Sequence, residues 1–330
     1  MNGSKYGLIL AASLLAWLAA IPLGMAQTPA SAVDEALQNI TTLKRAGRVG
    51  YATFWVGNKF VQCRRLAGGD MRCEAPATRL QPSLKSVLTP ARREQLASLG
   101  WALNPDFGNY TQDFPKEVPT REIVDLVLQT LTDGYDANTA ALELSTNWVA
   151  DTPCPPRAGR SQNLAGSVND SLAMRNVVIR ACSYEPQQTT EPAIAANAAE
   201  LVSIYGADVT AEIQRLRLNA NRRVWIVLEA GIGYIQCMPE RPAVALYCEA
   251  QSADSWPALA TVLTPARVAR LRQAGYADPG HAPNYSRSYP LDAFNDAALA
   301  RELLTLMHEV YGYTGSSKLR IATEQGVVSK

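Results

Sequence analysis

Hydrophobic and polar residues follow helical and strand periods in an order that occurs twice along the chain. In the first half, a helix is expected at 32–43, followed by strands at 51–56, 60–65 and 71–75. A short helix at 90–99, an amphipathic helix at 120–132 and an alternating strand at 142–146 complete this half. A strand is also expected between the two later helices, so the predicted order is α-β-β-β-α-β-α-β.

The second half repeats this order with small changes in length. A long alanine-rich helix is expected from 193 to 205 or beyond, followed by strands at 224–228, 234–237 and 244–249. The later helices are predicted at 265–274 and 296–311, and the closing strand at 319–323.

Identical residues at a fixed spacing show that the two halves are related. The hexapeptide VLTPAR stands at 87–92 and again 175 positions later at 262–267. At the same spacing Cys73-Glu74-Ala75 recurs as Cys248-Glu249-Ala250, and Gly100 recurs as Gly275. This period is much longer than the roughly 20–50 residues of a solenoid repeat, so it indicates two copies of a whole domain. We expect domains at 27–147 and 193–330, joined by a connector at 148–192.

The repeated hexapeptide is itself a helix-start signal. Its threonine is a good N-cap, because the hydroxyl can accept a hydrogen bond from an otherwise unpaired amide of the first turn. The proline that follows occupies the first helical position, where its missing amide hydrogen is not needed. Gly100 and Gly275 are expected to end these helices in the left-handed conformation.

The N-terminus has the pattern of a secretory signal peptide over residues 1–26. Lys5 precedes an apolar run at 8–21, and small residues, Gly24 and Ala26, precede the expected cleavage point. The alternative is a retained membrane anchor, but the run is shorter than the ~20 residues that a span needs. We expect a periplasmic or secreted protein without membrane contact after signal cleavage.

The charge balance argues against a nucleic-acid partner. The chain has 31 basic and 30 acidic side chains, and loss of Lys5 with the signal would make them equal. Proteins that hold phosphate backbones usually carry a basic face. The hydrophobic content of 47% is sufficient for two packed cores.

Six cysteines in an exported chain suggest disulfides. Cys63 and Cys73 flank one predicted hairpin turn, and Cys237 and Cys248 flank its counterpart, so each pair would lie on opposed strands. Cys154 and Cys182 in the connector remain for each other. Zinc is the alternative, but the chain has no Cys-x-x-Cys, and we expect neither a metal nor a cofactor.

Catalysis has little support in the sequence. The two histidines, His281 and His308, both lie in the second half, and no known nucleophile, phosphate-binding or metalloprotease motif occurs. Glu74 and Glu249 are repeated carboxylates that could act as acids or bases. Each follows a cysteine on a strand and points to the opposite face, where a solvated charge is the more common outcome. We therefore expect a protein that is not an enzyme.

The motifs VQC…MRCEA, LTPARREQLASLGW and NYTQDF resemble the YbjN and TY-Chap superfamily. This resemblance covers about 30–147 and 193–325. It implies a chaperone-like α+β fold with helices packed on an antiparallel sheet, similar to type III secretion chaperones, and a peptide-binding role. Because those chaperones act as dimers, it also implies a monomer in which the two copies form an intramolecular pseudo-dimer.

Two sets of residues are candidates for contact with a partner. The repeated aromatic residues could line a groove for an extended peptide, or they could pack at the edges of the cores, which is more common. They are Trp101, Tyr110 and Phe114 in the first copy and Tyr276, Tyr285 and Tyr289 in the second. In the connector, Arg160, Gln162 and Asn163 form either a polar contact loop or an ordinary solvated loop.

Together these features predict an exported, non-enzymatic tandem-domain protein that binds a protein or peptide. The fold would allow strand addition at a sheet edge or binding of a helix in an apolar groove. The alternatives are a degenerate envelope enzyme or an inhibitor that acts through the connector loop, or a structural envelope component.

Overall fold

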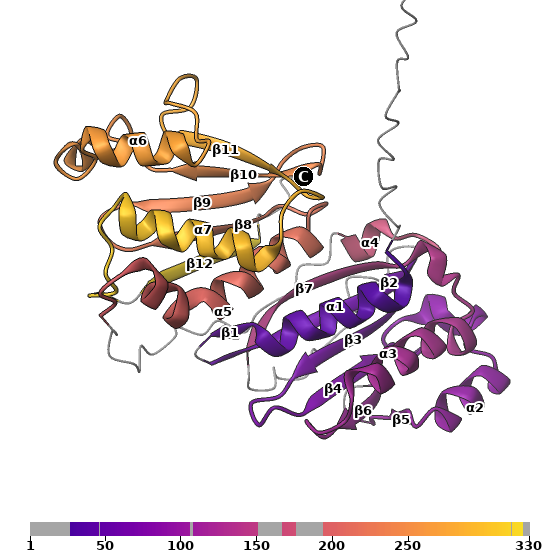
Figure 1. Cartoon of the computed structure of the whole chain (residues 1–330). Helices are drawn as coiled ribbons and strands as arrows, with labels where there is room; N and C mark the ends of the chain where they lie inside the picture. The colour runs from indigo at the N-terminus through magenta and orange to yellow at the C-terminus, as the bar shows by residue number, and fades with distance from the viewer. Residues whose placement is uncertain are drawn as a thin grey trace, which may run out of the picture.

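The computed structural model describes residues 27–45, 47–105, 108–150, 167–175, 194–317 and 319–325. The predicted signal peptide, the candidate loop with Arg160, Gln162 and Asn163, and the predicted Cys154–Cys182 disulfide lie outside these residues. Figure 1 shows two α+β units side by side, one from each half of the chain. No helix among the described residues has the length and apolar content that a bilayer span requires.

The first domain has the predicted order of elements. Its main elements are α1 (Pro29–Thr42), β2 (Arg48–Val56), β3 (Lys59–Arg65), β4 (Met71–Ala75), α2 (Pro90–Ser98), β6 (Tyr110–Phe114), α3 (Thr120–Gln129) and β7 (Glu143–Ala150). The main sheet runs β7-β2-β3-β4-β6 with antiparallel pairing throughout. Two short strands, β1 (Lys44–Arg45) and β5 (Ala102–Leu103), pair with β2 and β6.

The second domain repeats this topology. Its elements are α5 (Ala198–Leu218), β8 (Val224–Glu229), β9 (Tyr234–Pro239), β10 (Ala245–Ala250), α6 (Pro265–Gln273), β11 (Tyr285–Pro290), α7 (Asp296–Glu309) and β12 (Arg320–Gln325). The sheet order β12-β8-β9-β10-β11 matches the first sheet strand for strand, and all pairs are antiparallel. The predicted α+β fold with two tandem copies is therefore confirmed.

Helices cover one face of each sheet. α1 packs on β2, β3 and β7 in the first domain, and α5 and α7 pack on the second sheet. Strand residues alternate accordingly: Ile226, Leu228 and Cys237 are fully buried, whereas their neighbours on the opposite face are only partly covered. Antiparallel sheets with one covered face usually show this alternation.

The repeated sequence signals have the expected structural roles. The Thr89 and Thr264 hydroxyls accept hydrogen bonds from the amides of Arg92 and Arg267, at 3.3 and 3.4 Å. Gly100 and Gly275 follow the helices with φ of 91° and 81°. Disulfides join Cys63 to Cys73 and Cys237 to Cys248. Both link residues that are directly opposed on neighbouring strands, as predicted.

The boundary between the first domain and the connector differs from the expectation. β7 continues past residue 147 to Ala150, because it pairs along β2 as far as Arg48. The described connector segment 167–175, which contains α4 (Leu172–Arg175), also belongs to the first domain. Its Met174 forms a small buried cluster with Trp55 and Phe60.

A tight turn holds this connector segment against the first domain. The Gly57 amide donates to the Ser171 hydroxyl at 3.1 Å, and the Asn58 amide donates to the Val168 carbonyl at 2.8 Å. Gly57 has φ of +60°, and a Cβ at this position would lie 2.6 Å from the Val168 carbonyl oxygen. Only glycine fits this turn without displacing the segment.

We expect Gly57→Ala to destabilise the first domain by about 1–2 kcal/mol, from the left-handed backbone alone, and to expose 167–175 to proteases. Urea unfolding and limited proteolysis measure the two effects. Gly68→Ala is the matched control, because a Cβ there meets no heavy atom within 4 Å and the backbone is not left-handed. Equal stability and equal cleavage of the two variants would contradict this account of the turn.

Candidate functional site, a cleft between the two domains

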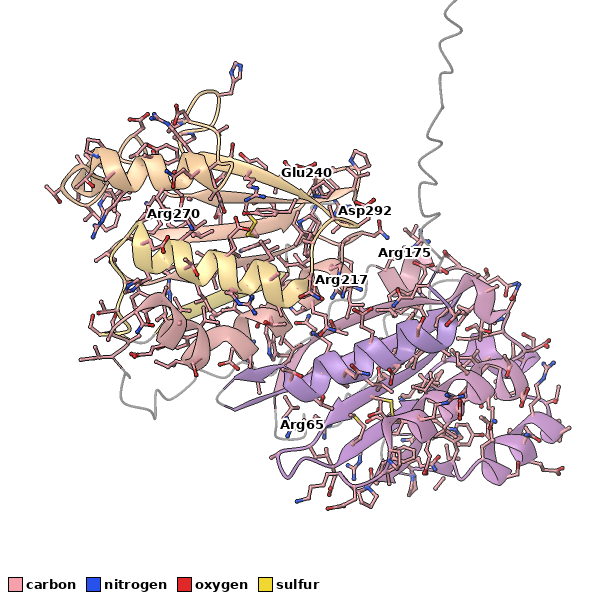
Figure 2. All side chains as sticks on the ribbon, in the orientation of Figure 1. Arg65, Arg175, Arg217, Glu240, Arg270 and Asp292 are labelled. Carbon is pink, nitrogen blue, oxygen red and sulfur yellow. A yellow bond between two sulfur atoms is a disulfide. The ribbon has the colours of Figure 1, made fainter. Side chains whose placement is uncertain are left out.

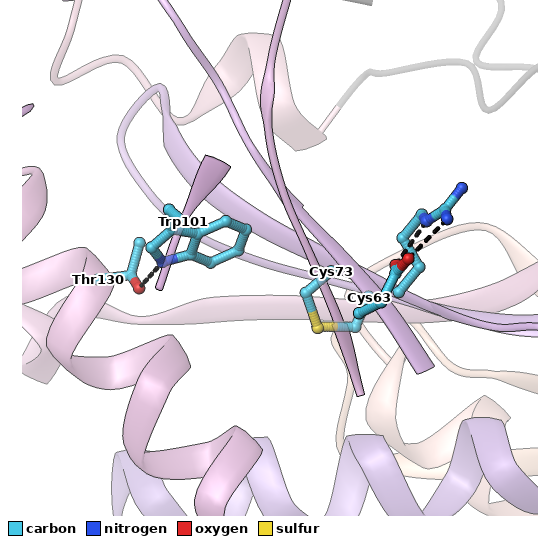
Figure 3. The surroundings of a disulfide bond; sticks show 6 residues. Cys63, Cys73, Trp101 and Thr130 are labelled. Carbon is cyan, nitrogen blue, oxygen red and sulfur yellow. Dashed lines mark hydrogen bonds and ion pairs between the residues drawn. A yellow bond between two sulfur atoms is a disulfide. The ribbon is translucent and has the colours of Figure 1, made fainter. Parts of the chain in front are cut away.

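The six candidate aromatic residues lie in the two hydrophobic cores. Their exposed fractions are 9% or less, and they belong to the two large buried clusters. The Trp101 indole donates to the Thr130 hydroxyl at 2.8 Å (Figure 3). Tyr289 donates to Glu302 at 3.0 Å, and burial raises the pKa of Tyr289 strongly. The structure places Trp101, Tyr110, Phe114, Tyr276, Tyr285 and Tyr289 where the alternative to the groove, core packing, would put them.

The repeated glutamates lie on the open faces of the sheets, one in each domain. Gln62 donates to Glu74 at 3.1 Å, and Gln236 donates to Glu249 at 2.7 Å. Asn284 also donates to Glu249, at 3.2 Å. Each carboxylate is therefore part of a polar cross-strand pair. Among the described residues, no group of three or more His, Cys, Asp or Glu side chains could hold a metal ion.

The two domains meet where α5 packs against α1 and the edge of β7. Asn39 of α1 is fully buried, and its amide donates to the Ala211 carbonyl at 2.9 Å and to Gln214 at 2.8 Å. At the end of α5, Asn219 accepts the backbone amide of Thr146 in β7 at 3.2 Å. This side chain satisfies a backbone donor at the edge of the sheet and closes that point to strand addition.

A buried ion pair lies next to this contact. The Arg215 side chain is 1% exposed, pairs with Glu212 at 3.2 Å and lies over the Trp148 ring, 4.7 Å from its centre. Trp148 belongs to β7, and it packs with Leu43 and Ala211 in a small cluster that spans both domains. Burial lowers the pKa of Arg215, while the Glu212 carboxylate acts in the opposite direction. The Glu212 carboxylate therefore favours the charged form of Arg215 at this buried position.

A second ion pair bridges the domains nearer the surface. Arg217 of α5 contacts Glu35 of α1 and also contacts Asp296 of α7 at 2.7 Å. Burial opposes ionisation of Glu35, but the hydrogen bond and charge of Arg217 outweigh it and lower the Glu35 pKa. Gln27 also donates to Glu35, at 2.8 Å.

Beside these contacts the domains leave a cleft of about 1060 Å³. Both domains and the connector segment 167–175 contribute to its walls. Its apolar lining residues are Ala32, Trp55, Leu142, Leu144, Leu172 and Leu218. The Leu172 side chain is 59% exposed, so it offers an apolar contact to a ligand in the cleft. Clefts at domain interfaces are common ligand sites.

The charged lining of the cleft is strongly asymmetric. Among the described residues it contains five arginines, Arg175, Arg217, Arg222, Arg223 and Arg241, and a single carboxylate, Glu143. Figure 2 shows Arg175 and Arg217 where the two domains face each other. Arg175 forms a bidentate pair with Glu143, at 2.5 and 2.9 Å, and this hydrogen bonding raises the pKa of Arg175. Arg217 is held by Glu35 and Asp296.

The other three arginines have no carboxylate within 4.0 Å among the described residues. Burial and the neighbouring charge of Arg215 lower the pKa of Arg222. Arg241 donates to the Asn221 carbonyl at 3.1 Å. The cleft therefore offers guanidinium groups whose charge the described protein residues do not neutralise.

Sequence reasoning did not find this site. The pair Arg222-Arg223 is visible after the long helix, but Arg241, Leu142 and Leu172 are distant along the chain. Only the docking of α5 on the first domain brings them together. No local motif carries this information.

Comparisons of the chain with family models, curated proteins and solved structures find no match. The resemblance to YbjN and TY-Chap domains stays a prediction from the motifs.

Removing one member of the buried ion pair should weaken the structure. We expect Glu212→Leu to cost about 3–5 kcal/mol, because Arg215 would keep a buried charge without its carboxylate. The double variant Glu212→Leu/Arg215→Met should recover most of that loss, since it removes both charges. Urea unfolding measures both values. A double variant as unstable as Glu212→Leu would show that the unpaired charge of Arg215 does not cause the loss of stability.

The bridge through Glu35 should depend on pH. The pKa of Glu35 in the folded protein lies below its ordinary value of 4.5. The stabilisation from the ionised carboxylate is therefore fully present above pH 4.5 and is lost as the pH falls through the lower pKa of the folded protein. We expect the urea midpoint to fall more between pH 6 and about pH 3 in the natural protein than in Glu35→Gln. Parallel decreases in the two proteins would exclude this contribution.

Proposed function

We propose that this chain is an exported, non-enzymatic binding protein that holds an extended segment of a partner protein in the cleft between its domains. The observation that carries this proposal is the mixed lining of the cleft, which contains both leucine side chains and guanidinium groups. An extended polypeptide presents apolar side chains and polar groups together, so it can satisfy both kinds of surface.

The size and place of the cleft support a polypeptide ligand. Its volume of about 1060 Å³ is slightly above the ~300–1,000 Å³ typical of small-molecule pockets. It lies at an interface between two domains, outside both cores. The resemblance to peptide-binding chaperones, although it rests on motifs alone, agrees with this role.

The location in an exported compartment has separate support. Two disulfides occur among the described residues, and disulfides persist mainly in oxidising compartments. The signal-peptide pattern at 1–26 agrees with export to the periplasm or the medium. In this proposal the protein acts as a monomer whose two domains associate within one chain.

Site-specific photo-crosslinking tests the location of the ligand. A photoreactive phenylalanine analogue at Leu172 should crosslink bound unstructured peptides, because Leu172 is 59% exposed in the cleft. The same analogue at Leu103, which is 56% exposed on the short strand β5, is the matched control and should give little product. Equal yields at the two positions, or none at Leu172, would count against peptide binding in the cleft.

A further inference from the structure

Three arginines form one cluster at one end of the second domain. Arg222 and Arg223 lie in the turn between α5 and β8, and Arg241 lies in the turn between β9 and β10. The hydrogen bond from Arg241 to the Asn221 carbonyl connects these turns. The cluster is therefore part of a defined surface, which reduces the ordering needed when a ligand binds.

Three carboxylates near the cleft already have arginine partners. Glu143 is paired with Arg175, whereas Glu35 and Asp296 are paired with Arg217. Among the described residues, no carboxylate lies within 4.0 Å of the Arg222, Arg223 or Arg241 guanidinium groups. Arg222 is partly buried, and a partly buried cation without a counter-charge is unfavourable, so an incoming anion would gain more beside Arg222 than at an open surface.

We infer that the cleft selects an acidic segment, in which Asp or Glu side chains bind Arg222, Arg223 and Arg241 while apolar side chains contact the leucines. This inference rests on the proposed function and adds the chemical class of the ligand. Guanidinium groups suit it well, because their planar donors match carboxylate oxygens in bidentate pairs.

The surroundings favour a peptide over a nucleic acid. Leu142, Leu144 and Leu218 line the same cleft, and a phosphate backbone would leave these apolar side chains without a partner. The chain as a whole has 31 basic and 30 acidic side chains, so it lacks the excess of charge common in proteins that track nucleic acids. Acidic and apolar residues in one peptide would match both parts of the lining.

Fluorescence anisotropy with the full chain tests the inference directly. The probes are a labelled unstructured peptide of alternating leucine and glutamate and the same peptide with glutamine in place of glutamate. We expect the acidic peptide to bind about tenfold or more tightly at low salt, and the difference to shrink as salt rises. Tighter binding of an oligonucleotide than of the acidic peptide would contradict the inference.

Variants locate the interaction. Arg223→Gln/Arg241→Gln should weaken the acidic peptide about tenfold or more and leave the glutamine peptide almost unchanged. Arg93→Gln, on the exposed surface of α2, is the matched control and should have no effect. Because Arg223 is exposed, Arg223→Glu should still fold and should shift preference toward a lysine peptide. An unchanged preference in these variants would overturn the assignment of the cluster.

The outcomes separate this inference from the proposed function. Equal binding of the acidic and glutamine peptides, with crosslinking at Leu172, would refute acidic selection and keep peptide binding. Failure of both peptides to bind, with no crosslinking at Leu172, would refute both.

Discussion

The packing of α5 against α1 and the edge of β7 determines where this protein can bind anything. Asn39 and Asn219 are buried there, and their amides satisfy polar groups across the contact. Such groups are costly to leave unpaired, so they favour one arrangement of the two domains over nearby alternatives. The arrangement also covers part of the β7 edge and leaves the cleft beside it as the open surface.

The position of the α5 C-terminus explains how a cluster of arginines is tolerated. A helix has partial negative charge at its C-terminal end, which favours nearby cations. Arg217 lies in the last turn of α5, and Arg222 and Arg223 follow shortly after it. The partial charge of about half a unit is smaller than the charge of one arginine. Most of the cluster's positive charge therefore remains available to a ligand.

Local signals in the sequence predicted the elements well and the site poorly. Thr89 marks a helix start through its hydroxyl cap and Gly100 marks the helix end through its left-handed backbone, and the spacing of Cys63 and Cys73 places them opposite each other in a hairpin. The periodicity around Trp101 could not separate a groove from a core, because both need an apolar side chain. The cleft depends on contacts between distant segments, such as Asn39 with Ala211, and no local pattern encodes them.

Duplication gave the protein two similar domains, but the cleft has two unlike walls. α5 contacts β7 across the interface, whereas α1 makes no comparable contact with the equivalent strand β12 among the described residues. The second domain therefore contributes the arginine cluster, while the first domain and its connector segment contribute Trp55, Leu144 and Leu172. A segment with acidic side chains on one side and apolar ones on the other would match these walls only with its acidic side toward the arginine cluster. Unlike walls thus determine which face of a bound segment meets which domain, a distinction that two identical walls would not make.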